Sequence, residues 1–284
     1  MKKQSRLAFI ALLTLGVGQC WGAEPKVQRD LAYAEPKHAL QTLDVYSPAE
    51  GKGHPIIVWI HGGGWRKGDK AGVQRKPLAL VERGFVFASI NYRFVPEVTI
   101  KQMMADVAQA IAWVRQHAAE FGGDPNRIVV MGHSAGAHLA ALVCTDDRYL
   151  KAAGVPLSAI RGCVPVDVSV YDIPKRLKDG GSVPPDTFKE IFGEAAESHR
   201  DLSPTAHVAS GKNIPAFLIL HVADRPDTRA QSEWFAKVLT DSGVSAKTVA
   251  AEGKTHGTIS GDLGLPNDKP TAALYEFLYA VVRK

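Results

Sequence analysis

Residues 128–143, IVVMGHSAGAHLAALV, place a single serine between an apolar run and a helix-like stretch. The run 128–131 predicts a buried strand, and 137–143 predicts a helix. A turn this tight leaves no room for side chains beside it, which explains the glycines at positions 132 and 136 and the outward-pointing hydroxyl of Ser134 on a strained backbone. The stretch therefore predicts a nucleophile elbow, with Ser134 as the nucleophile.

A glycine-rich motif, HGGGW at 61–65, follows the apolar run 55–60, which predicts another buried strand. Nucleophilic attack on a carbonyl places negative charge on its oxygen, and fixed backbone N–H groups stabilise that charge. We expect Gly63, Gly64 and Ala135 to supply these donors. Three glycines after a strand are also typical of a flexible turn, but their combination with the serine motif favours an oxyanion hole.

With these two motifs the chain resembles the α/β-hydrolase superfamily, and within it the HGGGW/GxSxG carboxylesterase branch of hormone-sensitive-lipase-like and feruloyl-esterase-like esterases. The resemblance spans nearly the whole chain after the first 22 residues. Shorter segments support it: GDK at 68–70, SINYR at 89–93 and DLSP at 201–204. The resemblance implies an acyl-enzyme formed on Ser134, and it implies no cofactor.

The resemblance also implies that the acid and the histidine of a catalytic triad follow the serine in the chain. The apolar run 214–221 predicts a strand, and Asp224 in the loop behind it falls on the family's acid position when spacing is counted back from the next helix. Because this loop is one residue shorter than in relatives, Asp227 is an alternative acid, and either aspartate is otherwise typical of a helix cap. His256, in the loop 253–257, is the expected general base.

Strand and helix patterns alternate along the 284 residues, of which 45% are hydrophobic, enough for one large core. The alternation predicts an α/β fold in which a mostly parallel sheet carries helices on both faces, in one domain over 23–284. We expect helices near 72–83, 101–121, 134–145, 229–240 and 271–282, and strands near 40–46, 56–60, 85–91, 127–131, 161–167, 214–221 and 245–250.

The segment 168–209 departs from this alternation, with a short helical piece near 188–194, and is expected to form a small cap-like insertion. Its large apolar residues either line an acyl or alcohol pocket or pack the insertion itself. Trp65 and His133, which adjoin the two motifs, are the expected substrate-binding residues. The large apolar residues of the insertion are Tyr171, Phe188, Ile191 and Phe192.

Residues 1–22 are typical of a secretory signal peptide, because three basic residues precede an apolar stretch at 7–17 and small residues stand at Gly22 and Ala23. The sequence therefore predicts a secreted or periplasmic protein without stable membrane insertion; an uncleaved anchor is the alternative. Without these residues the net charge falls from +5 to about +2. No cluster of Lys and Arg with interleaved aromatics then indicates a nucleic-acid partner.

Two cysteines of the exported chain, Cys144 and Cys163, lie in apolar runs. This placement favours buried free thiols, although export permits a disulfide. The histidines show no HExxH or comparable spacing, so the sequence predicts no metal site.

The motifs and the resemblance together predict an exported serine carboxylesterase for small or aromatic carboxylic esters, with acyl groups on plant polysaccharides among the candidate substrates. Two alternatives stay open. An arylformamidase-type amidase would use the same triad and glycine motif. A noncatalytic binding protein of the same fold usually lacks a triad member, whereas this sequence offers all three.

Overall fold

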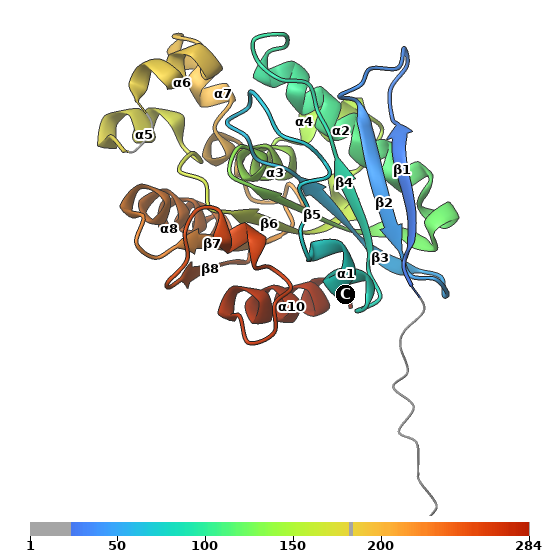
Figure 1. The fold of residues 1–284 in the computed structure, drawn as a ribbon. Helices are drawn as coiled ribbons and strands as arrows, with labels where there is room; N and C mark the ends of the chain where they lie inside the picture. The colour runs from blue at the N-terminus through green and yellow to red at the C-terminus, as the bar shows by residue number, and fades with distance from the viewer. Residues whose placement is uncertain (1–23, 182–183, 284) are drawn as a thin grey trace, which may run out of the picture.

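The computed structural model describes residues 24–181 and 184–283, so the predicted signal peptide lies outside the described residues. The strands are β1 (Lys26–Ala32), β2 (Thr42–Ser47), β3 (His54–Ile60), β4 (Val86–Ile90), β5 (Gly123–His133), β6 (Ile160–Val166), β7 (Ala216–Val222) and β8 (Ala246–Ala251). Within the described ranges they form one eight-stranded sheet in the order β1-β2-β4-β3-β5-β6-β7-β8 (Figure 1). β1 and β2 are antiparallel to their neighbours, and all pairs from β4 to β8 are parallel.

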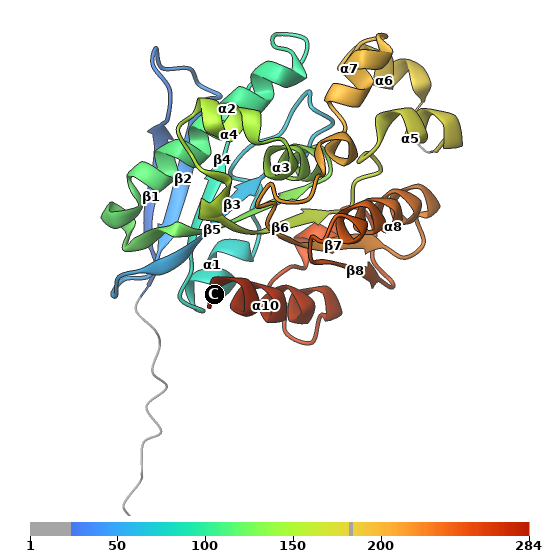
Figure 2. The same cartoon turned by 180° about the vertical axis from the view of Figure 1, so that it is seen from behind.

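The helices are α1 (Lys76–Val81), α2 (Ile100–Gln116), α3 (Ala135–Thr145), α4 (Asp147–Ala152), α5 (Ile173–Asp179), α6 (Pro185–Phe192), α7 (Ala196–Asp201), α8 (Pro226–Asp241), α9 (Thr258–Gly261) and α10 (Lys269–Val282). Helices α2, α3 and α8 pack on one face of the sheet, and α1, α9 and α10 pack on the other (Figure 1 and Figure 2). The predicted α/β architecture is therefore confirmed.

The centre of the sheet is buried on both faces. In β3, Ile56 and Val58 belong to one core cluster, whereas Ile57 and Trp59 belong to the cluster on the opposite face. Such strands appear in the sequence as continuous apolar runs, which is how β3 and β5 were predicted. The two strands pair in parallel with Ile60 opposite Gly132. The HGGGW motif and the serine motif therefore lie side by side at the carboxyl edge of the sheet.

Every residue of α3 is buried. A helix that is apolar on all sides belongs in the interior, where neighbouring elements fix both its ends. The position of Ser134, directly before α3, is thereby set by the core rather than by a mobile loop.

The structure adds one strand that the sequence did not predict. β1 has mostly exposed residues and lies at the edge of the sheet, so no alternation of apolar and polar residues marks it. The helix predicted at 101–121 is shorter than expected, because α2 ends at Gln116 and a 3₁₀ turn follows at Ala118–Phe121.

Helices α5, α6 and α7 gather beside the carboxyl ends of the central strands (Figure 1). The large apolar residues of this insertion are buried: Tyr171, Phe188, Ile191 and Phe192. Tyr171 stacks on Phe235 of α8, with ring centroids 4.5 Å apart. These side chains therefore pack the insertion against the domain, as one of the two sequence interpretations predicted.

Cys144 and Cys163 are both free and buried, so the prediction of buried thiols is confirmed. Burial and the neighbouring Cys144 raise the pKa of the Cys163 thiol. Among the described residues, no helix has the length and apolarity that a membrane span requires.

Candidate active site

Ser134 occupies a strained turn between β5 and α3. Its backbone has φ 55° and ψ −123°, a conformation that costs energy for any residue with a side chain. The glycines beside it are required by space: a Cβ on Gly132 would lie 2.2 Å from the carbonyl oxygen of Gly136, and a Cβ on Gly136 would lie 2.2 Å from that of Ile60. The predicted elbow geometry is therefore present.

His256 lies against the serine, although it comes from the loop after β8. Its Nε2 is 3.0 Å from Oγ of Ser134, and its Nδ1 is 2.7 Å from Oδ2 of Asp167. The Asp167 side chain is fully buried, whereas that of His256 is 43% exposed. A hydroxyl, an imidazole and a carboxylate are thus joined in series, the arrangement that activates a serine nucleophile.

The structure corrects the predicted acid, because the carboxylate at His256 belongs to Asp167 and not to Asp224. Asp224 is exposed in the turn after β7. The alternative, Asp227, accepts a hydrogen bond from the backbone of Thr228 in the first turn of α8 and lies 3.9 Å from Arg176.

The register between neighbouring strands explains this result. Val166 at the end of β6 pairs with Leu220 of β7, so both strands finish at the same edge. The backbone N–H of Asp167 donates to the carbonyl of Leu220 at 2.7 Å, and its Oδ1 accepts from the N–H of Val222 at 2.9 Å. The available signal was an aspartate at the carboxyl end of a predicted buried strand, the place where parallel sheets carry functional side chains.

The guanidinium group of Arg225 also contacts Asp167 and His256. Nη1 of Arg225 forms an ion pair with Oδ2 of Asp167 and lies 2.8 Å from Nδ1 of His256. Burial alone raises the pKa of Asp167, but the hydrogen bonds from His256 and Val222 and the charge of Arg225 lower it to about 2. Asp167 is therefore ionised at any pH near neutrality.

The HGGGW loop lies directly beside the serine, since a Cβ on Gly62 would be 3.0 Å from Cβ of Ser134. Gly63 and Gly64 have φ of 129° and 61°, so glycine is favoured at both positions. Within the described ranges, neither they nor Ala135 donate any of the backbone hydrogen bonds formed outside regular elements. Their proposed role as oxyanion donors agrees with this geometry and stays a prediction.

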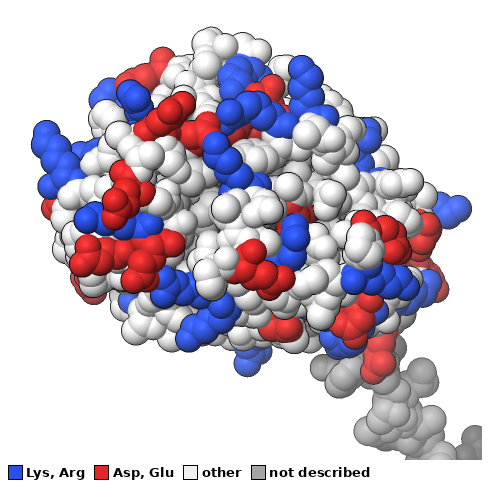
Figure 3. All heavy atoms as spheres, turned by 90° about the horizontal axis from the view of Figure 1, so that it is seen from above, with Lys and Arg blue, Asp and Glu red and all other residues white. Residues whose placement is uncertain are grey.

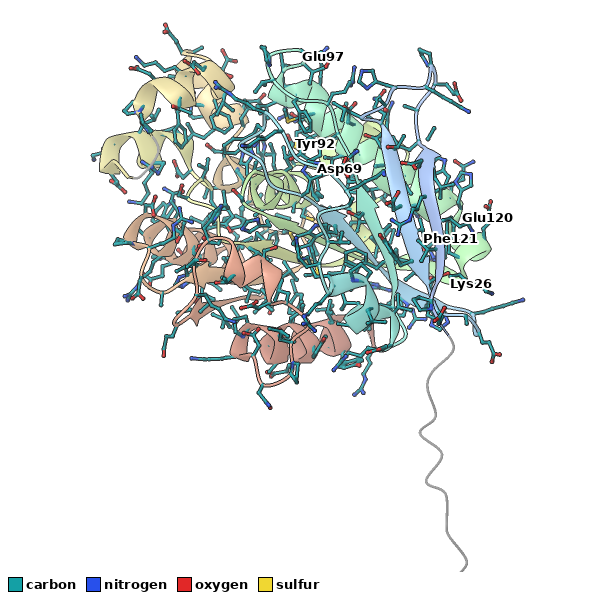
Figure 4. The ribbon with its side chains drawn as sticks, viewed as in Figure 1. Lys26, Asp69, Tyr92, Glu97, Glu120 and Phe121 are labelled. Atoms are coloured by element: carbon teal, nitrogen blue, oxygen red, sulfur yellow. The ribbon has the colours of Figure 1, made fainter. Side chains whose placement is uncertain are left out.

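His61 helps to hold the HGGGW loop in place through its contacts with Tyr92. Its ring stacks on Tyr92 with centroids 4.5 Å apart, and the Tyr92 hydroxyl, labelled in Figure 4, donates to the carbonyl of His61 at 2.8 Å. Burial lowers the pKa of His61, so the ring is neutral at pH 7. His61 therefore shapes the loop and does not carry charge into the site.

His133 lies inside the serine motif, and Trp65 is the last residue of the HGGGW motif. Trp65 is 7% exposed and packs edge-to-face on Phe192 of α6, with centroids 5.0 Å apart. His133 is held by Nε2 at 2.8 Å from the carbonyl oxygen of His256. Burial, with a further contribution from His256, lowers the pKa of His133 to about 4. His133 thus supports the histidine loop; contact of either residue with substrate stays a prediction.

The charged side chains seen from the carboxyl edge are mixed in sign. In Figure 3, Lys and Arg alternate with Asp and Glu over this face. The Arg66–Glu190 ion pair, which joins the HGGGW loop to α6, is one example.

The comparison with protein families identifies the chain. The model of the family described as BD-FAE matches residues 43–239. The chain belongs to the BD-FAE family. The match includes the glycines of the HGGGW motif, Ser134, Asp167 and Arg225, and ends before His256.

A curated relative aligns with most of this BD-FAE protein. It is 30% identical over 259 residues to a protein of Arabidopsis thaliana named probable isoprenylcysteine alpha-carbonyl methylesterase ICMEL1, an alignment that covers 84% of this chain and 53% of the other. The chain thus spans about half the length of that relative.

Two solved structures share the fold. A truncated carbohydrate esterase from gut microbiota has a TM-score of 0.75 at 21% identity and covers 91% of this chain and 97% of its own. An esterase of Thermogutta terrifontis, Est2, has a TM-score of 0.67 at 28% identity and covers 92% of both chains. The fold is that of the α/β-hydrolase superfamily, so the resemblance seen in the two sequence motifs is confirmed.

Proposed function

We propose that this BD-FAE protein is an exported serine carboxylesterase that hydrolyses small or aromatic carboxylic esters. The observation that carries the proposal is the series Ser134–His256–Asp167, with 3.0 Å between Ser134 Oγ and His256 Nε2 and 2.7 Å between His256 Nδ1 and Asp167 Oδ2. The names of its relatives, which include methylesterase and esterase, support the same reaction class.

In the proposed mechanism, Oγ of Ser134 attacks the ester carbonyl while Nε2 of His256 takes the hydroxyl proton. Amides of Gly63, Gly64 and Ala135 hold the negative oxygen of the tetrahedral intermediate. His256 then gives the proton to the departing alcohol, which leaves an acyl group on Ser134. A water molecule attacks this acyl-enzyme with His256 again as the base, and the acid product and free serine result. Asp167 accepts from Nδ1 of His256 and stabilises the transient imidazolium.

The decisive experiment measures ester turnover and fluorophosphonate labelling of the Ser134→Ala variant. The variant is expected to lose turnover of p-nitrophenyl acetate by at least about 10³-fold and to lose labelling by a fluorophosphonate probe. Ser158→Ala, at an exposed serine remote from the site, is the matched control and should retain both. An unlabelled wild-type protein would favour a noncatalytic binding protein of the same fold instead.

The substrate class needs a separate measurement. Esters from acetyl to octanoyl, methyl ferulate and acetylated xylan test chain length, aromatic acids and polysaccharide-linked acyl groups, and N-formylkynurenine tests the arylformamidase alternative. If N-formylkynurenine is turned over faster than every ester, the proposed function changes from esterase to an amidase that uses the same triad.

Export is proposed from the N-terminal sequence alone. The mature protein, recovered from periplasm or medium, is expected to begin after Gly22 or Ala23. Mass spectrometry of the intact protein checks this, and an uncleaved chain in the membrane fraction would favour the anchor instead.

A further inference from the structure

A guanidinium group is built into the proposed catalytic series. Arg225 lies in the turn between β7 and α8, where it is the residue before the first turn of the helix. Its carbonyl accepts from the Thr228 hydroxyl at 3.1 Å and from the N–H of Arg229 at 3.0 Å. The backbone of Arg225 is therefore fixed by α8, and its side chain, 26% exposed, points back to Asp167.

Two donors share one oxygen of Asp167. Nδ1 of His256 lies 2.7 Å from Oδ2, and Nη1 of Arg225 forms its ion pair with the same atom. The guanidinium nitrogen and the imidazole nitrogen are only 2.8 Å apart. The other oxygen, Oδ1, is occupied by the backbone N–H of Val222.

This geometry places a permanent positive charge against a ring that becomes positive during the reaction. A like charge at such a distance disfavours the protonated imidazole, whereas Asp167 favours it. The two effects oppose each other, and part of the Asp167 charge is neutralised by Arg225.

We propose that Arg225 is a positioning residue that extends ester hydrolysis to lower pH, by holding Oδ2 of Asp167 and by opposing the protonation of His256. The proposal rests on the proposed function, because it concerns the same histidine. Arg225 contacts the carboxylate and the far nitrogen of the ring, away from Ser134, so it acts through His256 and does not need to touch the substrate.

The other charged and titratable groups around His256 come from several elements. Asp167 follows β6, and the ring of His133 on β5 lies tilted by 37° beside that of His256, with centroids 4.5 Å apart; His133 is neutral above about pH 4. The charge of Lys76 on α1 contributes to the lowered pKa of His133. Burial lowers the pKa of Lys76 itself to about 7. On the histidine's own loop, Lys254 pairs with two aspartates, Asp262 and Asp268. These groups are unchanged in Arg225 variants, so the difference between profiles isolates Arg225.

The test compares pH profiles of kcat/KM and kcat for p-nitrophenyl acetate in full-length variants. Arg225→Met removes the charge and the donor, and Arg225→Gln keeps an amide donor for Asp167 but removes the charge. Both are expected to move the acidic limb upward by about 1 pH unit, which is about tenfold lower kcat/KM on that limb, with KM little changed. Arg225→Lys, which keeps the charge, should rescue most of the shift.

Arg229→Met is the matched control, since Arg229 lies on the exposed side of the same helix and pairs with Glu233; its profile should equal that of the wild type. Superimposable profiles for wild type, Arg225→Gln and Arg225→Met would overturn the proposal. Loss of folding in both neutral variants, judged by circular dichroism, would assign Arg225 to stability and overturn it equally. An inactive wild type that fluorophosphonate does not label would instead overturn the proposed function.

Discussion

At the scale of single residues, Asp167 carries the charge on which the site depends. Its side chain is fully buried, and a buried carboxylate is stable only when hydrogen bonds and opposite charge compensate it. Val222, His256 and Arg225 provide that compensation and keep the pKa of Asp167 at about 2. The residue is therefore an anion near neutral pH, as the proposed mechanism requires of it while His256 is protonated.

Asp167→Asn is expected to lower kcat by about 10³- to 10⁴-fold, because a neutral amide neither stabilises the imidazolium nor keeps the productive tautomer. Asp224→Asn is the matched control and should stay within about twofold of the wild type, as exposed substitutions usually do. Steady-state hydrolysis of p-nitrophenyl acetate by folded variants checks both. If Asp167→Asn were active and Asp224→Asn inactive, the triad acid would be Asp224, as the sequence predicted.

Ser134 and His256 could be predicted because each carries a local signal, a strained glycine-flanked turn for one and a loop after the last strand for the other. Asp167 carries none that separates it from Asp224, since one aspartate ends a predicted strand and the other follows a predicted strand. The choice between them depends on the register of β6 against β7 and on the positive φ of 50° at Asp167. Both are properties of tertiary packing.

At the scale of secondary-structure elements, the close packing of α3 against β3 fixes the distance between Ser134 and the HGGGW loop. Gly136 permits this approach, because its backbone lies against the carbonyls of Ile60 and His61. No side chain fits between the helix and the strand. The two motifs are therefore held together by direct contact of main chains.

Gly136→Ala is expected to destabilise the protein by about 1–3 kcal/mol, and to lower kcat more than KM, since the added methyl group would lie 2.2 Å from Ile60 O and 2.4 Å from His61 O. Gly261→Ala, where an added Cβ meets nothing within 4 Å, is the control and should be neutral. Urea unfolding and ester hydrolysis measure the two effects. Equal stability of the two variants would show that α3 can move away from β3 without cost.

The elements that the sequence predicted are those with a strong hydrophobic pattern. Residues 56–60 of β3, residues 128–132 of β5 and all of α3 are buried and appear as apolar runs. By contrast, β1 is mostly exposed, and the cap helices α5 and α7 are short. Short helices depend on tertiary contacts more than on their own sequence. The cap could therefore be predicted as an irregular segment with one helical piece near 188–194, which corresponds to α6, but not as three helices.

At the scale of the whole molecule, Lys76, the first residue of α1, is a buried titratable amine. Its Nζ donates to the carbonyl of Ser260 at 2.8 Å and lies 4.6 Å from the centroid of the Trp59 ring. Among the described residues, no carboxylate forms an ion pair with it. Burial lowers its pKa to about 7, so Lys76 couples the stability of the entire domain to pH.

Between about pH 7 and the ordinary lysine pKa of 10.5, the unfolded chain keeps the Lys76 proton that the folded protein has lost. The unfolded state then binds more protons, so this residue makes the free energy of unfolding increase as pH rises through that range. Lys76→Met is expected to remove the increase, and Lys237→Met, at an exposed lysine on α8, should keep it. Urea denaturation from pH 7 to 9.5 is the measurement; an unchanged slope in Lys76→Met would contradict the expectation.

The pairing of Ile60 with Gly132 at the middle of the sheet leads us to expect that inactivation begins elsewhere in the molecule. Amides in such central strands exchange with solvent only when the whole domain opens, while edge elements open separately at lower cost. Ser134 and the glycines of the HGGGW motif follow the central strands β5 and β3, whereas His256 follows β8, an edge strand. In mild denaturant we expect the loop that carries His256 to separate from Ser134 first. Turnover would then stop while the sheet stays intact. Dilution would then restore activity at the speed of loop closure, without refolding of the domain.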